Sequence, residues 1–320
     1  MAVVRAELPS GFTWRRPRVD DAEAVLGVIT RHNTPLVGSA DFTLSEVRDE
    51  LGYPGFDPST NAWLVHDQVG TAVAYGFAHG KGASDLVDIV VYADGDVAAW
   101  LWTEVLTRAR EIGAASGHGE VNVDVGIYQN DDGQQTLARS RGFAPVTTFQ
   151  RMRIDFDTPP PDPTVPDGVV VRTGPGDERF RRQAHDVSRR AFVDHFGFVE
   201  RSFEEWHESI DVPATADWAQ LRVAYVDGEP AAMVRGSNEF LGDEDCGYVA
   251  TVAVHPRARG RGLAKLLLRQ AFVDDFRRGR RGTVLHVDAN NVTPAVDLYL
   301  RVGMRPVLAF DVWRARLTTS

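Results

Sequence analysis

The chain has 320 residues and a formal net charge of -10, and its 43% hydrophobic and 25% charged residues are typical of a globular protein. No apolar run approaches the ~18 residues of a membrane span and no signal-peptide core opens the chain, so we expect a cytoplasmic protein without a membrane partner. The acidic balance argues against nucleic-acid binding, and the lone Cys246 excludes an intramolecular disulfide and a cysteine-rich zinc site, so no metal is predicted.

The length predicts two domains, and a proline-rich segment marks the boundary between them. Residues 155–168 carry five prolines among acidic and small residues, a composition that holds neither a helix nor a central strand. We therefore predict an N-terminal domain over 1–156, a linker over 157–168 and a C-terminal domain over 169–320.

The two halves repeat the same order of predicted elements: a strand, an amphipathic helix, a hairpin, a strand, a long helix, a strand and a closing strand. In the first half these elements fall at 12–18, 20–32, 62–79, 86–93, 96–113, 120–128 and 149–156. In the second half they fall at 169–175, 177–192, 221–240, 247–255, 262–279, 283–290 and 310–317. The chain therefore reads as two copies of one α/β (α+β) unit.

A basic, glycine-containing turn separates the strand and the long helix of the second half, at "VAVHPRARGRGLAKLLL", 252–268. A Walker loop is excluded because Leu266 follows Lys265, and a dinucleotide fingerprint is excluded because Lys265 stands at its third glycine. The amides of a helix N-terminus, approached closely through glycines and flanked by arginines, suit a diphosphate. The alternative is a solvated basic turn.

The residues Arg257, Gly260 and Gly262 form R-x-x-G-x-G, which resembles the [QR]-x-x-G-x-[GA] hallmark of the GNAT superfamily of acyl-CoA-dependent N-acyltransferases. The resemblance implies tandem domains, each with a mixed, mostly antiparallel sheet flanked by helices, and acetyl-CoA as the co-substrate. It places the coenzyme on Val252, Ala253, Val254, Arg257, Arg259, Gly260, Arg261, Gly262, Leu263, Ala264 and Asn291.

The resemblance also implies roles within this set. A bulge in the strand would turn amides near Val252 and Val254 toward the thioester carbonyl, and Asn291 would contact the pantetheine arm, although an asparagine there also suits a helix N-cap. Tyr299, four residues before Gly303, stands at the family position of the general acid. A tyrosine in a leucine-rich helix is otherwise a core residue.

The general base is left open by the sequence. Tyr248 stands where the family often has a glutamate, so Asp245 or Glu244, Tyr248 acting through water, or no dedicated base all remain. For the acceptor pocket we predict His195, Phe196 and Trp206 from the aromatic segment 191–210, with His286 from the following strand. These four residues could equally be packing residues.

The first half looks like a degenerate copy, because Asp94 and Asp96 occupy its matching turn and Ala138 stands at the position of Tyr299. The sequence thus predicts an acyl-CoA-dependent N-acetyltransferase, a monomer or homodimer acting on a small-molecule amine. The competing hypothesis is a non-catalytic CoA-binding or regulatory protein with degenerate domains.

Overall fold

A computed structural model describes residues 7–53, 55–290 and 295–319. The chain divides into two compact units, described here separately. The N-terminal unit runs to Thr148 and also takes the residues from Phe310 on, and the C-terminal unit comprises Phe149–Ala309. No helix among the described residues has the length and apolar character to cross a membrane.

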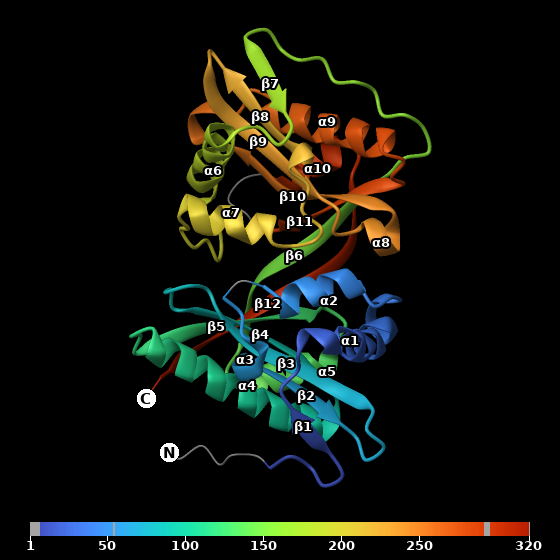
Figure 1. Cartoon of the computed structure of the whole chain (residues 1–320), viewed down its shortest axis with the longest axis vertical. Helices are drawn as coiled ribbons and strands as arrows, with labels where there is room; N and C mark the ends of the chain where they lie inside the picture. The colour runs from blue at the N-terminus through green and yellow to red at the C-terminus, as the bar shows by residue number, and fades with distance from the viewer. Residues whose placement is uncertain (1–6, 54, 291–294, 320) are drawn as a thin grey trace. The chain divides into compact units, whose positions relative to one another are not determined.

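The N-terminal unit is a mixed, mostly antiparallel sheet with helices on both faces (Figure 1). Its strands run in the order β1 (Thr13–Arg15), β2 (Ala62–His66), β3 (Ala72–Gly80), β4 (Leu86–Tyr92), β5 (Glu120–Tyr128) and β12 (Arg305–Thr318). Only the β4–β5 pair among these neighbours is parallel. The helices are α1 (Ala22–Val37), α2 (Leu44–Leu51), α3 (Pro58–Asn61), α4 (Gly95–Ala115) and α5 (Asp132–Ser140), with the 3-10 turn η1 (Val19–Asp21).

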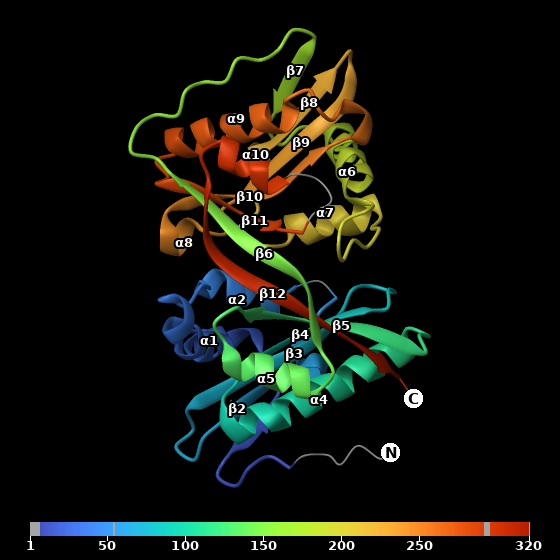
Figure 2. The same cartoon turned by 180° about the vertical axis from the view of Figure 1, so that it is seen from behind.

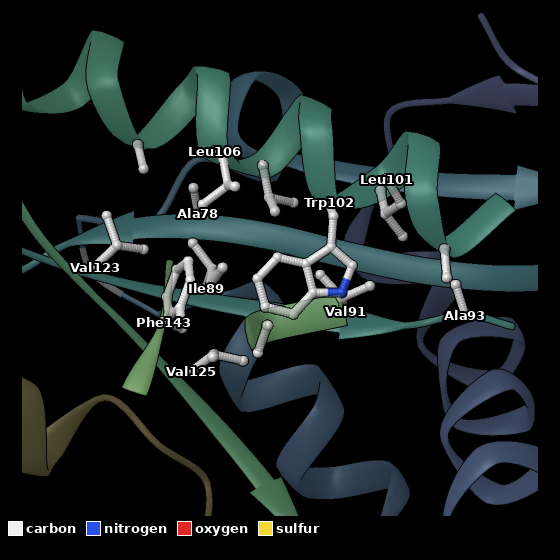
Figure 3. Packing of buried hydrophobic residues seen from close by; sticks show 14 of the residues in the cluster. Ala78, Ile89, Val91, Ala93, Leu101, Trp102, Leu106, Val123, Val125 and Phe143 are labelled. Atoms are coloured by element: carbon white, nitrogen blue, oxygen red, sulfur yellow. The ribbon is translucent and has the colours of Figure 1, made fainter. Parts of the chain in front are cut away.

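The largest core of this unit lies under α4. Trp102 is fully buried and packs edge-on against Phe143, with ring centroids 5.4 Å apart, among aliphatic side chains from β4 and β5 (Figure 3). Trp100 belongs to the same cluster. Trp100 and Trp102 are therefore core residues.

The C-terminal unit repeats the architecture. Its strands run in the order β6 (Ala144–Asp155), β11 (Gly282–Asp288), β10 (Cys246–Val254), β9 (Glu229–Ser237), β8 (Leu221–Val226) and β7 (Val169–Thr173). Again only one pair, β10–β11, is parallel. The helices are α6 (Glu178–Phe192), α7 (Phe203–Asp211), α8 (Leu241–Glu244), α9 (Leu263–Arg277) and α10 (Ala295–Arg301), with 3-10 turns η2 (Trp218–Gln220) and η3 (Pro256–Ala258). Figures 1 and 2 show α6 and α7 on one face of this sheet and α9 on the other.

The closing strands are exchanged between the halves. Strand β6 belongs to the first half of the sequence, but its residues 149–155 pair with β11. Residues 310–318 of β12 pair with β5. The compact units thus differ from the predicted domain limits, because 149–156 falls in the C-terminal unit and 310–320 in the N-terminal unit. An apolar-alternating strand fits the edge of either sheet, so its sequence does not specify its partner.

A buried ion pair anchors α9 at the end remote from the basic turn. The carboxylate of Asp275 accepts from Arg280 Nη1 at 2.7 Å and from Thr283 Oγ1 at 2.5 Å. Gly247 packs against this ion pair, and a Cβ atom added to Gly247 would lie only 2.1 Å from the Asp275 carboxylate. This packing ties α9 to the start of β10 and β11, the two strands that form the site.

Candidate active site

The site forms where β10 and β11 separate. The parallel ladder joins Cys246 to Gly282, Gly247 to Thr283 and Tyr248 to Val284, and then ends. On its other edge β10 shifts register against β9 between Val249 and Thr251, so the bulge expected in this strand is present. Beyond it, the backbone groups of β10 that face β11 have no recorded ladder partner among the described residues.

A cavity of about 570 Å³ occupies the gap between the two strands. Its wall combines β10 and β11 with the end of α6, the turn before α9, one face of α10 and Phe149 of β6. Of the predicted residues, Val252, Ala253, Val254, Arg259, Gly260, Gly262, Leu263, Ala264, His195, Phe196, His286 and Tyr299 line it. The structure therefore brings most of the predicted coenzyme residues together.

The turn at one side of the cavity leaves a run of backbone amides without partners. None of the described residues accepts a hydrogen bond from the amides of residues 260–265. Gly260 and Gly262 have φ of +79° and +74°, values that side-chain-bearing residues adopt only with strain. Unpaired amides at the positive end of a 15-residue helix form a site for an anion.

The three arginines of the turn have different surroundings. Arg259 lines the cavity and donates to the carbonyl of Ala191 at 3.2 Å. Arg257 is exposed, with its nearest recorded carboxylate on Glu229 at 3.9 Å, and Arg261 is exposed as well. Neither Arg257 nor Arg261 lines the cavity, which differs from the prediction that all three contact the diphosphate.

Tyr299 lines the cavity from α10 and is only 6% exposed. Its hydroxyl has no recorded hydrogen-bond partner among the described residues. Burial raises the pKa of Tyr299 above its usual range, so the phenol stays protonated at neutral pH. The amides of Val302 and Met304 both donate to its carbonyl, where Gly303, at a φ of +96°, ends the helix. Asn291, the other predicted residue of this region, lies outside the described residues.

His286 is held on both ring nitrogens. Arg151 Nε donates to Nε2 at 3.3 Å, and the Tyr248 hydroxyl lies 3.1 Å from Nδ1. Because an arginine can only donate, Nε2 is the acceptor, and the neutral ring donates its Nδ1 proton to Tyr248. Burial, with the nearby charge of Arg151, lowers the pKa of His286 to about 3. His286 is therefore a neutral wall residue with no ring nitrogen to spare for a substrate.

The candidates for the base on and before β10 do not line the cavity. Tyr248 points to His286, and Glu244 is bound by Arg151 at 3.1 Å and by Arg153. Asp245 is exposed at φ +51°, just after α8. Both arginines come from β6, the exchanged strand, so the sequence of the C-terminal half contained no sign that Glu244 is paired.

Trp206 does not form part of the cavity either. It packs in the layer between α6 and α7, with its ring 5.2 Å from His185 and 5.8 Å from Trp218. It serves the core on the α6 side of the sheet. An aromatic residue on an amphipathic helix carries no sign of whether it faces a core or a ligand.

Several cavity residues were not predicted from the sequence, Lys265 and Phe149 among them. Lys265 lies one turn into α9, at a spacing that places it near Gly262, and this could have been noticed. Phe149 comes from β6 and could not have been assigned to this unit from its sequence.

In the N-terminal unit, the side chain of Gln134 lies at the place that corresponds to the cavity wall residue Ala295. Gln134 has the same spacing to Ala138 as Ala295 has to Tyr299, and it accepts from Trp102 Nε1 at 2.9 Å and donates to the Ala93 carbonyl at 3.0 Å. Its counterpart Ala295 lines the cavity of the C-terminal unit. Asp94, at the start of α4, has an exposed carboxylate. These features agree with a degenerate first copy.

Among residues 7–53, 55–290 and 295–319, no three or more His, Cys, Asp or Glu side chains are grouped so that they could hold a metal ion. Cys246 is fully buried, and burial raises its pKa to about 11, so its thiol is unreactive at neutral pH.

The known proteins that this chain resembles include acetyltransferases. Residues 184–304 match the acetyltransferase (GNAT) family. A mycothiol acetyltransferase of Acidothermus cellulolyticus is 30% identical over 53% of this chain, and the match spans only about half, 55%, of that relative. A mycothiol acetyltransferase of Actinosynnema mirum is 29% identical, over 76% of this chain and 78% of its own length.

Solved structures extend the likeness to the whole chain. A GCN5-related N-acetyltransferase from Sphaerobacter thermophilus has a TM-score of 0.80 and 25% identity, with 98% of each chain covered. A tandem GNAT protein from the clavulanic acid biosynthesis pathway has a TM-score of 0.71 over 95% of this chain and 98% of its own; its 17% identity speaks for the fold alone. The C-terminal half of this chain accordingly contains the match to the acetyltransferase (GNAT) family, and the chain as a whole is similar in fold to a tandem GNAT protein.

Proposed function

We propose that the C-terminal unit transfers an acetyl or other short acyl group from coenzyme A to an amine of a small molecule. The observation that carries the proposal is the cavity between the separated strands β10 and β11, with free amides at residues 260–265 and Tyr299 in its wall. Its volume of about 570 Å³ is in the usual range for small-molecule sites.

The residues present fit coenzyme A. Its diphosphate would accept hydrogen bonds from the amides of the turn, with Arg259 and Lys265 supplying positive charge in the same wall. The pantetheine arm would run along the open edge of β10, where amides near Val252 and Val254 can polarise the thioester carbonyl. Hence the acyl carbon would lie close to Tyr299.

The chemistry is then a direct displacement. The amine nitrogen attacks the thioester carbon, the C–S bond breaks, and the thiolate takes the Tyr299 proton while the amine proton passes to a base. A phenol kept protonated by burial suits the first proton transfer. Ground-state binding of coenzyme A does not require this hydroxyl, so its role is confined to turnover.

We assign the base to His195, in the turn that follows α6. It lines the cavity, and its pKa is lowered mainly by burial, against a smaller opposing effect of Asp288. His195 is therefore neutral at pH 7 and able to take a proton. It replaces the carboxylate candidates, which lie outside the cavity wall.

The pH profile should report this base. We expect wild-type kcat/KM to fall as the pH drops through a value below 6.5, the ordinary value for histidine, because protonated His195 cannot accept a proton. His195→Asn should lose this limb and about tenfold of the plateau rate, since solvent can still take the proton. A weakly basic acceptor keeps the amine's own titration out of the profile.

His185→Asn is the matched control, because burial also lowers the pKa of His185, which lies on α6 away from the cavity. The pH profile of His185→Asn should still show the fall in kcat/KM at acid pH. If His195→Asn also shows that fall, His195 is excluded as the base.

The proposal itself is tested by thiol release from acetyl-CoA across a panel of small amines, amino acids and aminoglycosides. The panel also includes the amine substrate of a mycothiol acetyltransferase, because the relatives carry that name. Coenzyme A should raise the melting temperature of the protein, and at least one amine should accelerate thiol release. Stabilisation by coenzyme A without turnover of any amine would favour a non-catalytic CoA-binding protein, and no stabilisation at all would reject both functions.

A further inference from the structure

Arg235, in the middle of the C-terminal sheet, is a buried arginine without a recorded hydrogen bond. Its Nε atom has no solvent-accessible surface and no acceptor. Among the described residues, none is recorded as accepting a hydrogen bond from any of its nitrogens, although the residue as a whole keeps some accessible surface. Burial lowers the pKa of Arg235. A charge in this position costs stability unless something neutralises it.

Other buried arginines of the same unit show the usual arrangement. Arg222, on the neighbouring strand β8, lies 3.1 Å from the Asp274 carboxylate. Arg280 pairs with Asp275 at 2.7 Å, and Arg151 with Glu244 at 3.1 Å. Arg235 differs from all three in having no carboxylate within ion-pair distance among the described residues.

The register of the sheet places Arg235 beside the cavity. It stands opposite Thr251 of β10, and directly opposed residues share a face of the sheet. Thr251 lines the cavity. The next pair on this face, Met233 and Ala253, packs against the α6 core. Arg235 thus lies on the α6 and α7 face, level with the cavity wall and opposite the face covered by α9.

The nearby charges leave the guanidinium incompletely neutralised. Glu239 is the carboxylate whose charge favours protonated Arg235, and it is not hydrogen-bonded to it. The same cavity wall also contains Asp288, a negative group near His195. The wall therefore offers a carboxylate to a cationic amine, and Arg235, on β9 opposite the wall residue Thr251, is the cation available to an anion.

We propose that Arg235 binds an anionic group of the acceptor, a carboxylate or a phosphate, so that the substrate is an amine that carries a negative charge. The inference rests on the proposed acyl transfer and adds the substrate class. A bound carboxylate or phosphate would supply the hydrogen bonds that the guanidinium lacks. It would also hold the acceptor on the face of β10 where the amine can reach the thioester.

The test compares acceptors with and without the anion: alanine with alaninamide, and glucosamine 6-phosphate with glucosamine. Wild type should favour the charged member of at least one pair, and which pair responds tells carboxylate from phosphate. Arg235→Met should lower kcat/KM for that charged member about 30-fold, the usual effect of losing a charged hydrogen bond. The neutral member and the Kd of coenzyme A should be unchanged, and Arg235→Lys should restore part of the loss.

Arg222→Met is the matched control for damage to the fold. It removes a buried arginine that has a partner, so it should lower the melting temperature without changing acceptor preference. Arg235→Met removes an unpaired charge, so its melting temperature should not fall. A lowered melting temperature with equal losses for both members of a pair would make Arg235 a structural residue and overturn the proposal.

The two proposals fail differently. If neutral amines are acetylated as well as charged ones, the acyl-transfer function stands and the anion site is rejected. If no amine is turned over, the melting temperature is measured with coenzyme A and each charged amine. If a charged amine raises the melting temperature of wild type but not of Arg235→Met, the anion site stands and the acyl-transfer function is rejected. If no charged amine raises it, both proposals are rejected.

Discussion

Replacing Tyr299 with phenylalanine is expected to lower kcat about 100-fold, the usual contribution of a general acid, while the Kd of coenzyme A stays the same. The phenol lies in the cavity wall and burial keeps it protonated, so it is placed to protonate the departing thiolate. Phenylalanine keeps the ring and its packing against the α9 core. Steady-state thiol release and a separate binding measurement check the two halves of this expectation.

Tyr225→Phe is the control for the loss of a tyrosine hydroxyl. Tyr225 lies on β8, outside the cavity wall, and its hydroxyl donates to Gln183 at 2.7 Å. This variant should retain wild-type turnover. An unchanged kcat in Tyr299→Phe would return Tyr299 to the core, and a rise in KM alone would make it a binding residue.

Gly262→Asp is expected to abolish measurable binding of coenzyme A. At a φ of +74°, any side chain strains the backbone by about 1 kcal/mol. The aspartate also adds a negative charge to the run of free amides, where repulsion from each phosphate costs on the order of 1 kcal/mol or more. Together these effects predict a rise in Kd of at least ~100-fold, so that calorimetry should detect no binding heat under conditions where wild type binds coenzyme A.

Gly279→Asp separates the loss of the site from the loss of the fold. Gly279 follows α9 at its other end, has φ +78° and, like Gly262, has no atom within 4 Å of an added Cβ. The substitution therefore introduces the same strain and charge away from the turn. It should lower the melting temperature to a similar extent and leave the affinity for coenzyme A intact. Retained affinity in Gly262→Asp would reject the diphosphate assignment.

The exchanged strands suggest why a first copy without the site residues is kept. Strand β6 supplies Phe149 to the cavity wall and Arg151 to His286, although both belong to the first half of the sequence. In return, residues 310–318 complete the sheet that holds β5. Neither half of the sequence alone contains all the strands of its sheet.

The sequence by itself determined the elements, their repetition and several of the residues that line the cavity. Alternating apolar positions gave the strands, 3.6-residue periodicity gave the helices, and the positive-φ glycines of the turn follow from local backbone sterics. The place of Tyr299 in the cavity wall was predictable, because Tyr299 and Gly303 are only four residues apart, in α10 and the turn that ends it. All of these are properties of neighbouring residues.

Only the tertiary structure decided which strands pair and which charges meet. The apolar pattern of β6 fits either sheet edge, so the pairing of Glu244 with Arg151 and the locked ring of His286 depend on contacts far apart in the sequence. Arg235 likewise looks like any strand arginine until the register places it beside the cavity, with no partner among the residues that the structure describes. Periodicity specifies the face that a residue occupies, whereas its neighbour across the sheet is set by long-range packing.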